Sequence, residues 1–132
     1  MTDESVNLKG THILVLEDNY LVAEVIREQL EYLGCEVIGP SLNVGDALKL
    51  VSVHSLDGAL LDVNLAGEFC FPVAAALKNG NVPFVFLTGY TDIATIPIEF
   101  QSTPQILKPF DYEKLAQLIV SHFHPQTRIS RA

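Results

Sequence analysis

Basic residues are scarce in this chain. Its 132 residues include 8 Lys and Arg against 16 Asp and Glu, which gives a formal net charge of −8 at pH 7, and no run of basic residues occurs. Contacts to nucleic-acid phosphates and to anionic lipids depend on Lys and Arg. The charge balance therefore argues against direct binding to DNA, RNA or an acidic membrane surface.

The motifs of several other classes of protein are also missing. Cys35 and Cys70 lack the CxxC spacing of zinc and redox sites, which favours two small buried side chains. No apolar stretch approaches the roughly 20 residues that span a bilayer, and the acidic residues 1–10 lack the apolar segment of a signal peptide. No GxGxxG follows the first apolar run, which argues against a dinucleotide-binding loop. We therefore expect a cytoplasmic protein.

Hydrophobic residues make up 48% of the chain, which is enough for a compact core in a single domain. Five short apolar or β-branched runs alternate with longer segments of helical periodicity. The runs are residues 12–16, 35–39, 59–61, 82–87 and 105–107. Continuous apolar runs indicate strands that are covered on both faces. The pattern predicts an α/β fold with a doubly wound, five-stranded parallel sheet.

Caps and prolines predict where the helices begin and end. The residues that cap or end the first, second and last helices are Asn19, Gly34, Ser41 or Asn43, and Asp111. The third helix is expected at about residues 69–78. Pro97 lies within residues 91–100, so the fourth helix should be short or irregular. Pro40 is expected to end the second strand, and residues 64–67 are expected to form a loop.

Polar residues stand where four of the predicted strands end. They are Glu17, Asp18, Asp62, Thr88 and Lys108. The carboxyl ends of the strands in a parallel α/β sheet form the crevice where ligands bind, so these side chains should converge. Each of them alone has a plainer interpretation as a helix cap, a turn residue or part of an ordinary loop. Their joint occurrence at successive strand ends favours a site.

The acids of this set have the chemistry of a Mg²⁺ site. Three carboxylates in one crevice repel one another unless a hard cation screens them, and Mg²⁺ prefers oxygen ligands and bridges carboxylate to phosphate. Asp18 and Asp62 would be direct ligands, and Glu17 would reach the metal directly or through water. The backbone carbonyl of Asn64 is the most plausible further ligand.

The remaining residues suit transfer of a phosphoryl group to a carboxylate. Lys108 supplies a positive charge that can pair with Asp62 at rest and with phosphoryl oxygens afterwards. The hydroxyl of Thr88 can donate to a phosphoryl oxygen. Pro109 follows the lysine, and a cis X-Pro bond would turn the lysine side chain into the pocket.

At these intervals, residues 11–123 resemble the receiver domain of two-component response regulators. The motifs are Glu17-Asp18, Asp62 in LLDVNL, Thr88 in FLTGY, and Lys108-Pro109-Phe110. The resemblance implies a flavodoxin-like receiver fold with Asp62 as phosphoacceptor, Mg²⁺ at the acids, and Thr88 and Lys108 at the phosphoryl group. VPFVFLTGY followed by IPIEF is similar to the alphaproteobacterial FATGUY group, many of which are stand-alone receivers with a short or irregular fourth helix.

Two positions depart from the common receiver pattern. Gln105 lies three places before the lysine, where most receivers carry an aromatic switch residue. Coupling of Thr88 to an aromatic ring is therefore either rerouted through Tyr90 or absent. Glu17 stands where Asp is common, and its longer arm should alter the metal geometry only modestly.

The resemblance implies a single-domain response regulator. A histidine kinase or histidine phosphotransfer protein would donate to Asp62, and the protein would signal, shuttle or sink phosphate in a relay through protein contacts, with a homodimer left open. It would catalyse only its own phosphorylation and dephosphorylation. Residues 1–10 are expected to be a flexible lead-in and residues 124–132 a short tail, with no output domain.

Two alternatives belong to other functional classes. One is a receiver-like binding module that acts without phosphorylation, which Gln105 keeps open for the switch but the intact acids argue against. The other is an enzyme with an aspartyl intermediate. Such enzymes need a general acid two residues beyond the nucleophile, and Asn64 at that position cannot transfer protons.

Overall fold

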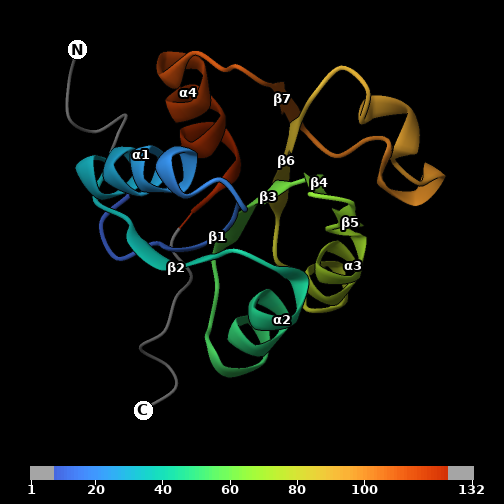
Figure 1. Cartoon of the computed structure of the whole chain (residues 1–132). Helices are drawn as coiled ribbons and strands as arrows, with labels where there is room; N and C mark the ends of the chain where they lie inside the picture. The colour runs from blue at the N-terminus through green and yellow to red at the C-terminus, as the bar shows by residue number, and fades with distance from the viewer. Residues whose placement is uncertain (1–7, 125–132) are drawn as a thin grey trace.

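The core of the molecule is one parallel sheet of five strands, seen in a computed structural model that describes residues 8–124 (Figure 1). The strands are β1 (His12–Leu16), β2 (Glu36–Ser41), β3 (Gly58–Asp62), β6 (Phe84–Thr88) and β7 (Gln105–Leu107). Their order across the sheet is β2-β1-β3-β6-β7, and every neighbouring pair is parallel. The expected doubly wound sheet is confirmed.

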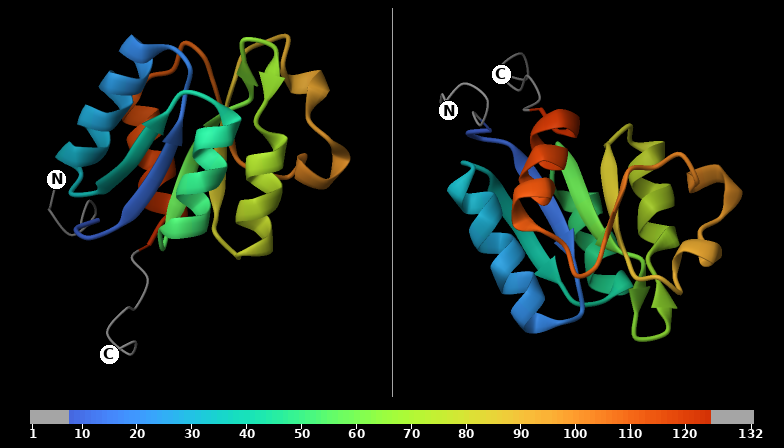
Figure 2. Two further views of the ribbon diagram at one scale, coloured as in Figure 1. Left: turned by 60° about the horizontal axis from the view of Figure 1, so that its bottom comes forward. Right: turned by 90° about the horizontal axis from the view of Figure 1, so that it is seen from above.

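Among the described residues, four helices cover the sheet on both of its faces (Figure 2). They are α1 (Tyr20–Tyr32), α2 (Val44–Val53), α3 (Phe71–Asn79) and α4 (Tyr112–His122). α1 and α4 cover one face, where Ile26, Leu30, Leu115 and Ile119 are buried, and α2 and α3 cover the other. Within residues 8–124, no helix is long and apolar enough to cross a membrane.

The central strands explain why both faces need helices. Ile13 and Val15 of β1 enter the core under α1 and α4, whereas Leu14 and Leu16 enter the core under α2 and α3. All four side chains are fully buried. Because successive residues of a strand point to opposite faces, a continuous apolar run can fill two cores at once.

Two expectations about local structure were wrong. The second strand continues through a cis Gly39-Pro40 bond to Ser41, whose carbonyl accepts a hydrogen bond from the Glu17 amide at 3.0 Å. β2 is an edge strand, where proline is tolerated because one side of the strand has no ladder partner. Residues 64–67 are not a simple loop. They belong to a hairpin of β4 (Asn64–Leu65) and β5 (Glu68–Phe69), so α3 begins at Phe71 rather than at residue 69.

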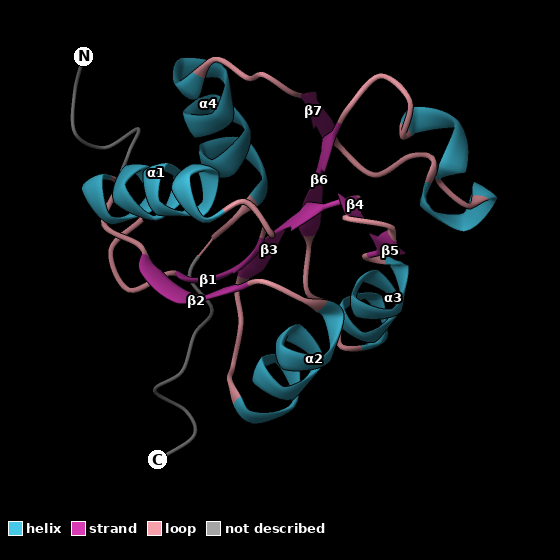
Figure 3. Cartoon of the chain, viewed as in Figure 1, coloured by secondary structure: helices cyan, strands magenta, loops and turns pink. Residues whose placement is uncertain are grey.

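The segment between β6 and β7 forms two single 3₁₀ turns, η2 (Ile93–Thr95) and η3 (Ile98–Phe100), in place of a fourth long helix (Figure 3). This confirms the short or irregular helix expected around Pro97. The ring of Phe100 is buried, and its centroid lies 6.1 Å from that of Phe71 and 5.9 Å from that of Phe84. Aromatic contacts at this spacing are favourable, so the far end of the segment is anchored to the core.

The expected lead-in and tail lie mostly outside the described residues. Of residues 1–10, only 8–10 are described, and Leu8 is buried in the core under α1 and α4. Of residues 124–132, only His124 is described, and it is exposed. Phe123, just after α4, is fully buried against the start of β3.

That contact gives a test of the packing. A Cβ atom at Gly58 would lie only 2.5 Å from Cδ1 of Phe123, so Gly58→Ala should lower the free energy of unfolding by about 1–3 kcal/mol through overpacking. Urea unfolding at one pH measures this. Gly45→Ala is the matched control, because its nearest contact would be an ordinary 3.5 Å to Asn43. Equal effects of the two substitutions would contradict the packing described for β3 and Phe123.

Candidate functional site

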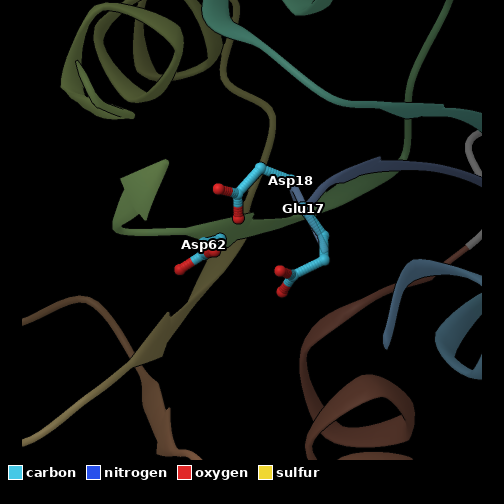
Figure 4. Close-up of side chains that lie close together, drawn as sticks. All are labelled: Glu17, Asp18 and Asp62. Carbon is cyan, nitrogen blue, oxygen red and sulfur yellow. The ribbon is translucent and has the colours of Figure 1, made fainter. Parts of the chain in front are cut away.

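A pocket of about 550 Å³ opens at the carboxyl ends of the strands. Its lining includes Glu17, Asp18, Asp62, Asn64, Asp92 and Lys108. These residues come from the ends of β1, β3 and β7, from the first residue of β4 and from the loop after β6. Figure 4 shows the three carboxylates that follow β1 and end β3 gathered at one place.

Glu17 is the most deeply buried acid of this group, with no exposed surface. Its backbone extends the line of β1, and its side chain turns into the site. Oε2 accepts a hydrogen bond from the Asn19 amide at 3.1 Å, and Oε1 lies 2.9 Å from Nζ of Lys108. The buried charge therefore has both an ionic partner and a backbone donor, which buried carboxylates require.

Asp18 and Asp62 complete the acidic cluster. Asp62 is the last residue of β3 and only 3% exposed, whereas Asp18 is exposed at the mouth of the pocket. One carboxylate oxygen from each of Glu17, Asp18 and Asp62 lies within 4.8 Å of the other two. The sequence prediction that these acids converge agrees with this arrangement.

Lys108 joins the two buried acids. Nζ lies 3.1 Å from Oδ2 of Asp62 as well as 2.9 Å from Glu17, so the resting ion pair is shared and not limited to Asp62. Burial alone would lower the pKa of Lys108, but the hydrogen bond to Glu17 and the charge of Asp62 outweigh it and raise that pKa. The bond to Pro109 is cis, and the Lys108 amide donates to the Thr88 carbonyl at 2.7 Å.

Asp62 is held in an unfavourable environment for a carboxylate. Burial and the charge of Glu17 raise its pKa to about 7, although Lys108 acts in the opposite direction. When ionised, the three acids and one ammonium leave two net negative charges in the cluster. Three oxygen donors with this charge excess fit a hard divalent cation such as Mg²⁺. The same residues could then hold the metal without rearranging the strands.

Three residues that were considered for a switch lie outside the lining of this pocket. They are Thr88, Tyr90 and Gln105. Thr88 ends β6, is 1% exposed, and donates from Oγ1 to the Ile106 carbonyl at 3.4 Å. It is not among the described residues that line the pocket. Tyr90 is 79% exposed and also lies outside the lining, and Gln105 is half-buried on β7.

One pocket acid, Asp92, was missed by the sequence reasoning. It directly precedes η2 as its N-cap and is half-buried at the edge of the pocket. Oδ2 accepts from the Gly89 amide at 3.2 Å, and Oδ1 accepts from Nδ2 of Asn64 at 3.3 Å. The only signal in the sequence was an acid four residues after Thr88, in a segment whose path was expected to be irregular.

Known proteins resemble this chain in sequence and in fold. The family model for the response regulator receiver domain matches residues 13–120. The transcriptional regulatory protein CrdR of Helicobacter pylori is 32% identical over 117 residues, which cover 85% of this chain and 54% of CrdR. The sensory transduction protein LytT of Bacillus anthracis is 33% identical over 114 residues, 81% of this chain and 45% of LytT. The chain thus spans about half the length of these curated relatives.

Solved structures agree with the family model. The solution structure of SdrG from Sphingomonas melonis Fr1 is 36% identical with a TM-score of 0.73, and the match covers 91% of this chain and 98% of SdrG. SdrG has also been solved in a BeF₃-activated conformation, with a TM-score of 0.71 and coverage of 86% and 96%. The narrower resemblance to the FATGUY group stays a prediction.

The environment of Asp62 predicts a pH-dependent stability difference. In the unfolded chain an Asp has a pKa near 3.9, so a raised folded-state pKa makes the native state bind more protons between that value and about 7. Stability is then lost as pH rises through this window. Asp62→Asn removes the effect.

In EDTA, the melting temperature of Asp62→Asn should therefore exceed that of the unaltered chain by roughly 5 °C at pH 8, and the difference should shrink towards pH 4.5. Thermal melts at four or five pH values measure it. A difference that stays constant from pH 4.5 to 8 would contradict the raised pKa.

Proposed function

The chain belongs to the response regulator receiver domain family, and on that premise we propose that it accepts a phosphoryl group on Asp62 from a phosphohistidine. The donor would be a histidine kinase or a histidine phosphotransfer protein. The phosphorylated chain would then signal, shuttle or sink phosphate through contacts with other proteins. The observation that carries this proposal is the Glu17–Lys108–Asp62 cluster, in which a buried carboxylate at a strand end is paired with an ammonium.

The transfer is a displacement at phosphorus. A carboxylate oxygen of Asp62 forms the new P–O bond while the P–N bond of the phosphohistidine breaks, and its electron pair stays on the ring nitrogen. Little covalent chemistry is asked of the protein, so catalysis rests on positioning and charge neutralisation. Lys108 is 3.1 Å from Oδ2 of Asp62, and this short distance supports a role for its charge in neutralising the phosphoryl oxygens.

Mg²⁺ would be held by Glu17, Asp18 and Asp62, with the backbone carbonyl of Asn64 as a further ligand. When bound, it supplies positive charge that offsets the repulsion between an anionic acceptor and an anionic donor. The two net negative charges of the cluster support this assignment. Glu17 also keeps Lys108 in the site through their 2.9 Å contact.

Thr88 would respond to the phosphoryl group. The hydrogen bond from its hydroxyl to the Ile106 carbonyl is long at 3.4 Å. A phosphoryl oxygen is a stronger, charged acceptor and can take that hydrogen bond. Rotation of Thr88 would disturb the contact with β7. With Gln105 in place of an aromatic residue, the response would pass through Tyr90 and the segment that follows it, or the protein would act as a phosphate sink.

The receiver would work in the cytoplasm. SdrG is matched over 98% of its own length, whereas CrdR and LytT are about twice as long as the parts that match. A second candidate is a binding module that acts without phosphorylation. Gln105 is the observation that favours it, because the usual aromatic partner of the switch threonine is missing.

Phosphorylation is tested by intact-protein mass spectrometry after incubation with Mg²⁺ and acetyl phosphate. The unaltered chain should gain one phosphoryl group, and Asp62→Asn or prior EDTA should abolish the gain. Asp46→Asn is a matched control at an exposed acid outside the pocket, and it should be labelled normally. Mg²⁺-dependent labelling of Asp62→Asn would overturn the assignment of the acceptor. Failure of the unaltered chain with acetyl phosphate and with kinase partners would favour the binding module.

Lys108→Ala separates the lysine from the metal ligands. It removes the charge that faces the incoming phosphoryl group but leaves all three carboxylates, so the rate of phosphorylation should fall by roughly 100-fold. Magnesium affinity, followed by thermal shift, should change much less. Lys114→Ala, at an exposed position on α4, is the control. Equal losses of rate and of Mg²⁺ affinity would contradict the role given to Lys108.

A further inference from the structure

Asp92 ties together two loops at the edge of the pocket. Its Oδ1 accepts from the side chain of Asn64, in the hairpin after β3, at 3.3 Å. Its Oδ2 accepts from the amide of Gly89, directly after Thr88, at 3.2 Å. Asn64, Gly89 and Asp92 all line the same pocket as Asp62. One carboxylate therefore bridges the acceptor's loop and the loop of the proposed switch threonine.

The hairpin side of this bridge is itself held in place. The other polar atom of Asn64, Oδ1, accepts from the Gly67 amide at 2.7 Å. The turn between β4 and β5 places Ala66 and Gly67 at positive φ, 55° and 98°. Because the Asn64 amide is committed to the hairpin through its oxygen, its nitrogen is presented in a defined direction to Asp92.

The other side of the bridge leads into residues 89–100, which are held in different ways at their two ends. Asp92 directly precedes η2, and its carbonyl accepts from both the amide and the hydroxyl of Thr95, at 3.0 and 2.5 Å. Further on, Ile96 and Phe100 are buried in the core. Tyr90 and Ile93 are exposed. The Asp92 carboxylate thus holds the start of this segment by hydrogen bonds, whereas apolar packing anchors its end.

A phosphoryl group on Asp62 would weaken the hydrogen bonds of the Asp92 carboxylate in two ways. It would bring up to two negative charges and strong acceptor oxygens into a pocket that Asp92 also lines. Like charges repel in such a partly enclosed site. The phosphoryl oxygens would also compete for the amide hydrogen of Gly89, because a doubly charged acceptor forms the stronger hydrogen bond.

We propose that Asp92 is a resting-state latch, which holds the Gly89 amide and the Asn64 side chain until a phosphoryl group on Asp62 displaces its carboxylate, takes over the Gly89 amide and frees residues 90–95. The inference rests on the proposed phosphorylation and names the positioning residue that couples it to the surface of the segment. The coupling does not require an aromatic residue at Gln105. Tyr90 and Ile93 are the exposed apolar side chains whose arrangement would change.

Amide hydrogen exchange of residues 90–95, followed by mass spectrometry, tests the latch. In the unaltered chain, Mg²⁺ with BeF₃⁻ as the phosphoryl analogue should raise exchange roughly fivefold, as expected for the loss of one or two net hydrogen bonds. Asp92→Ala should show the raised exchange without the analogue. Asp92→Asn keeps a carbonyl acceptor for Gly89 but has no charge, so the analogue should raise its exchange by less than half as much.

Glu99→Gln is the matched control, because Glu99 is an exposed acid on the same segment and does not line the pocket. It should behave as the unaltered chain. An Asp92→Asn response equal to that of the unaltered chain, or lower exchange after activation, would overturn the latch. A tenfold or greater loss of Mg²⁺ affinity in Asp92→Asn would also overturn it and make Asp92 a metal ligand.

The two proposals fail in different ways. If the unaltered chain takes no phosphoryl group from acetyl phosphate and does not respond to the analogue, the proposed function fails and the release step fails with it. If the unaltered chain is phosphorylated but the Asp92 variants behave like it, only the latch fails.

Discussion

The ion pair that Lys108 shares between Glu17 and Asp62 is the interaction on which the functional end of the molecule depends. Lys108 follows β7 at one edge of the sheet, whereas Glu17 follows β1, three strand spacings or about 14 Å away. Only long side chains can meet over the ends of β3 and β6. The extra methylene of Glu17 therefore has a structural use, since it lets the first acid reach the lysine at 2.9 Å.

In this cluster, the charges that the proposed chemistry needs lower the stability of the fold. One ammonium cannot neutralise three acids, and burial together with the charge of Glu17 raises the pKa of Asp62 to about 7. A sequence selected for stability alone would place an apolar residue at the end of the central strand. The excess negative charge fits the proposed function, in which a cation and then a phosphoryl group occupy the pocket. Asp92 adds to this excess, and its carboxylate is held by hydrogen bonds from Asn64 and Gly89, which fits its proposed displacement.

The sequence predicts well which acids gather at the site, because these residues lie at the ends of strands. The apolar runs gave β1, β6 and β7, and the polar residues after the strands predicted the acids that converge. Pro97 correctly predicted the broken helix between β6 and β7. These features depend on local composition and on the geometry common to parallel sheets.

The features that escaped prediction depend on the path of a few backbone bonds. β2 continues past Pro40 because an edge strand tolerates it, and the β4–β5 hairpin requires Ala66, a residue without special turn propensity, to adopt a positive φ. Whether Asp92 reaches Gly89 and Asn64 depends on how the loop after β6 folds back. Thr88 was expected to face the ligand, yet at rest its hydroxyl is turned to the Ile106 carbonyl. Side-chain direction of this kind is set by tertiary contacts.

The most direct test of the central claim is calorimetric titration with Mg²⁺ at several pH values, in buffers that differ in ionisation enthalpy. If the strand-end acids form the cation site, one Mg²⁺ should bind per chain and displace protons from Asp62, since a metal ligand must be deprotonated. Proton release should be about half a proton near pH 7 and should vanish by pH 9, as follows from a pKa of about 7. No binding at millimolar Mg²⁺, or identical binding and proton release in Asp62→Asn, would contradict a divalent-cation site built around Asp62.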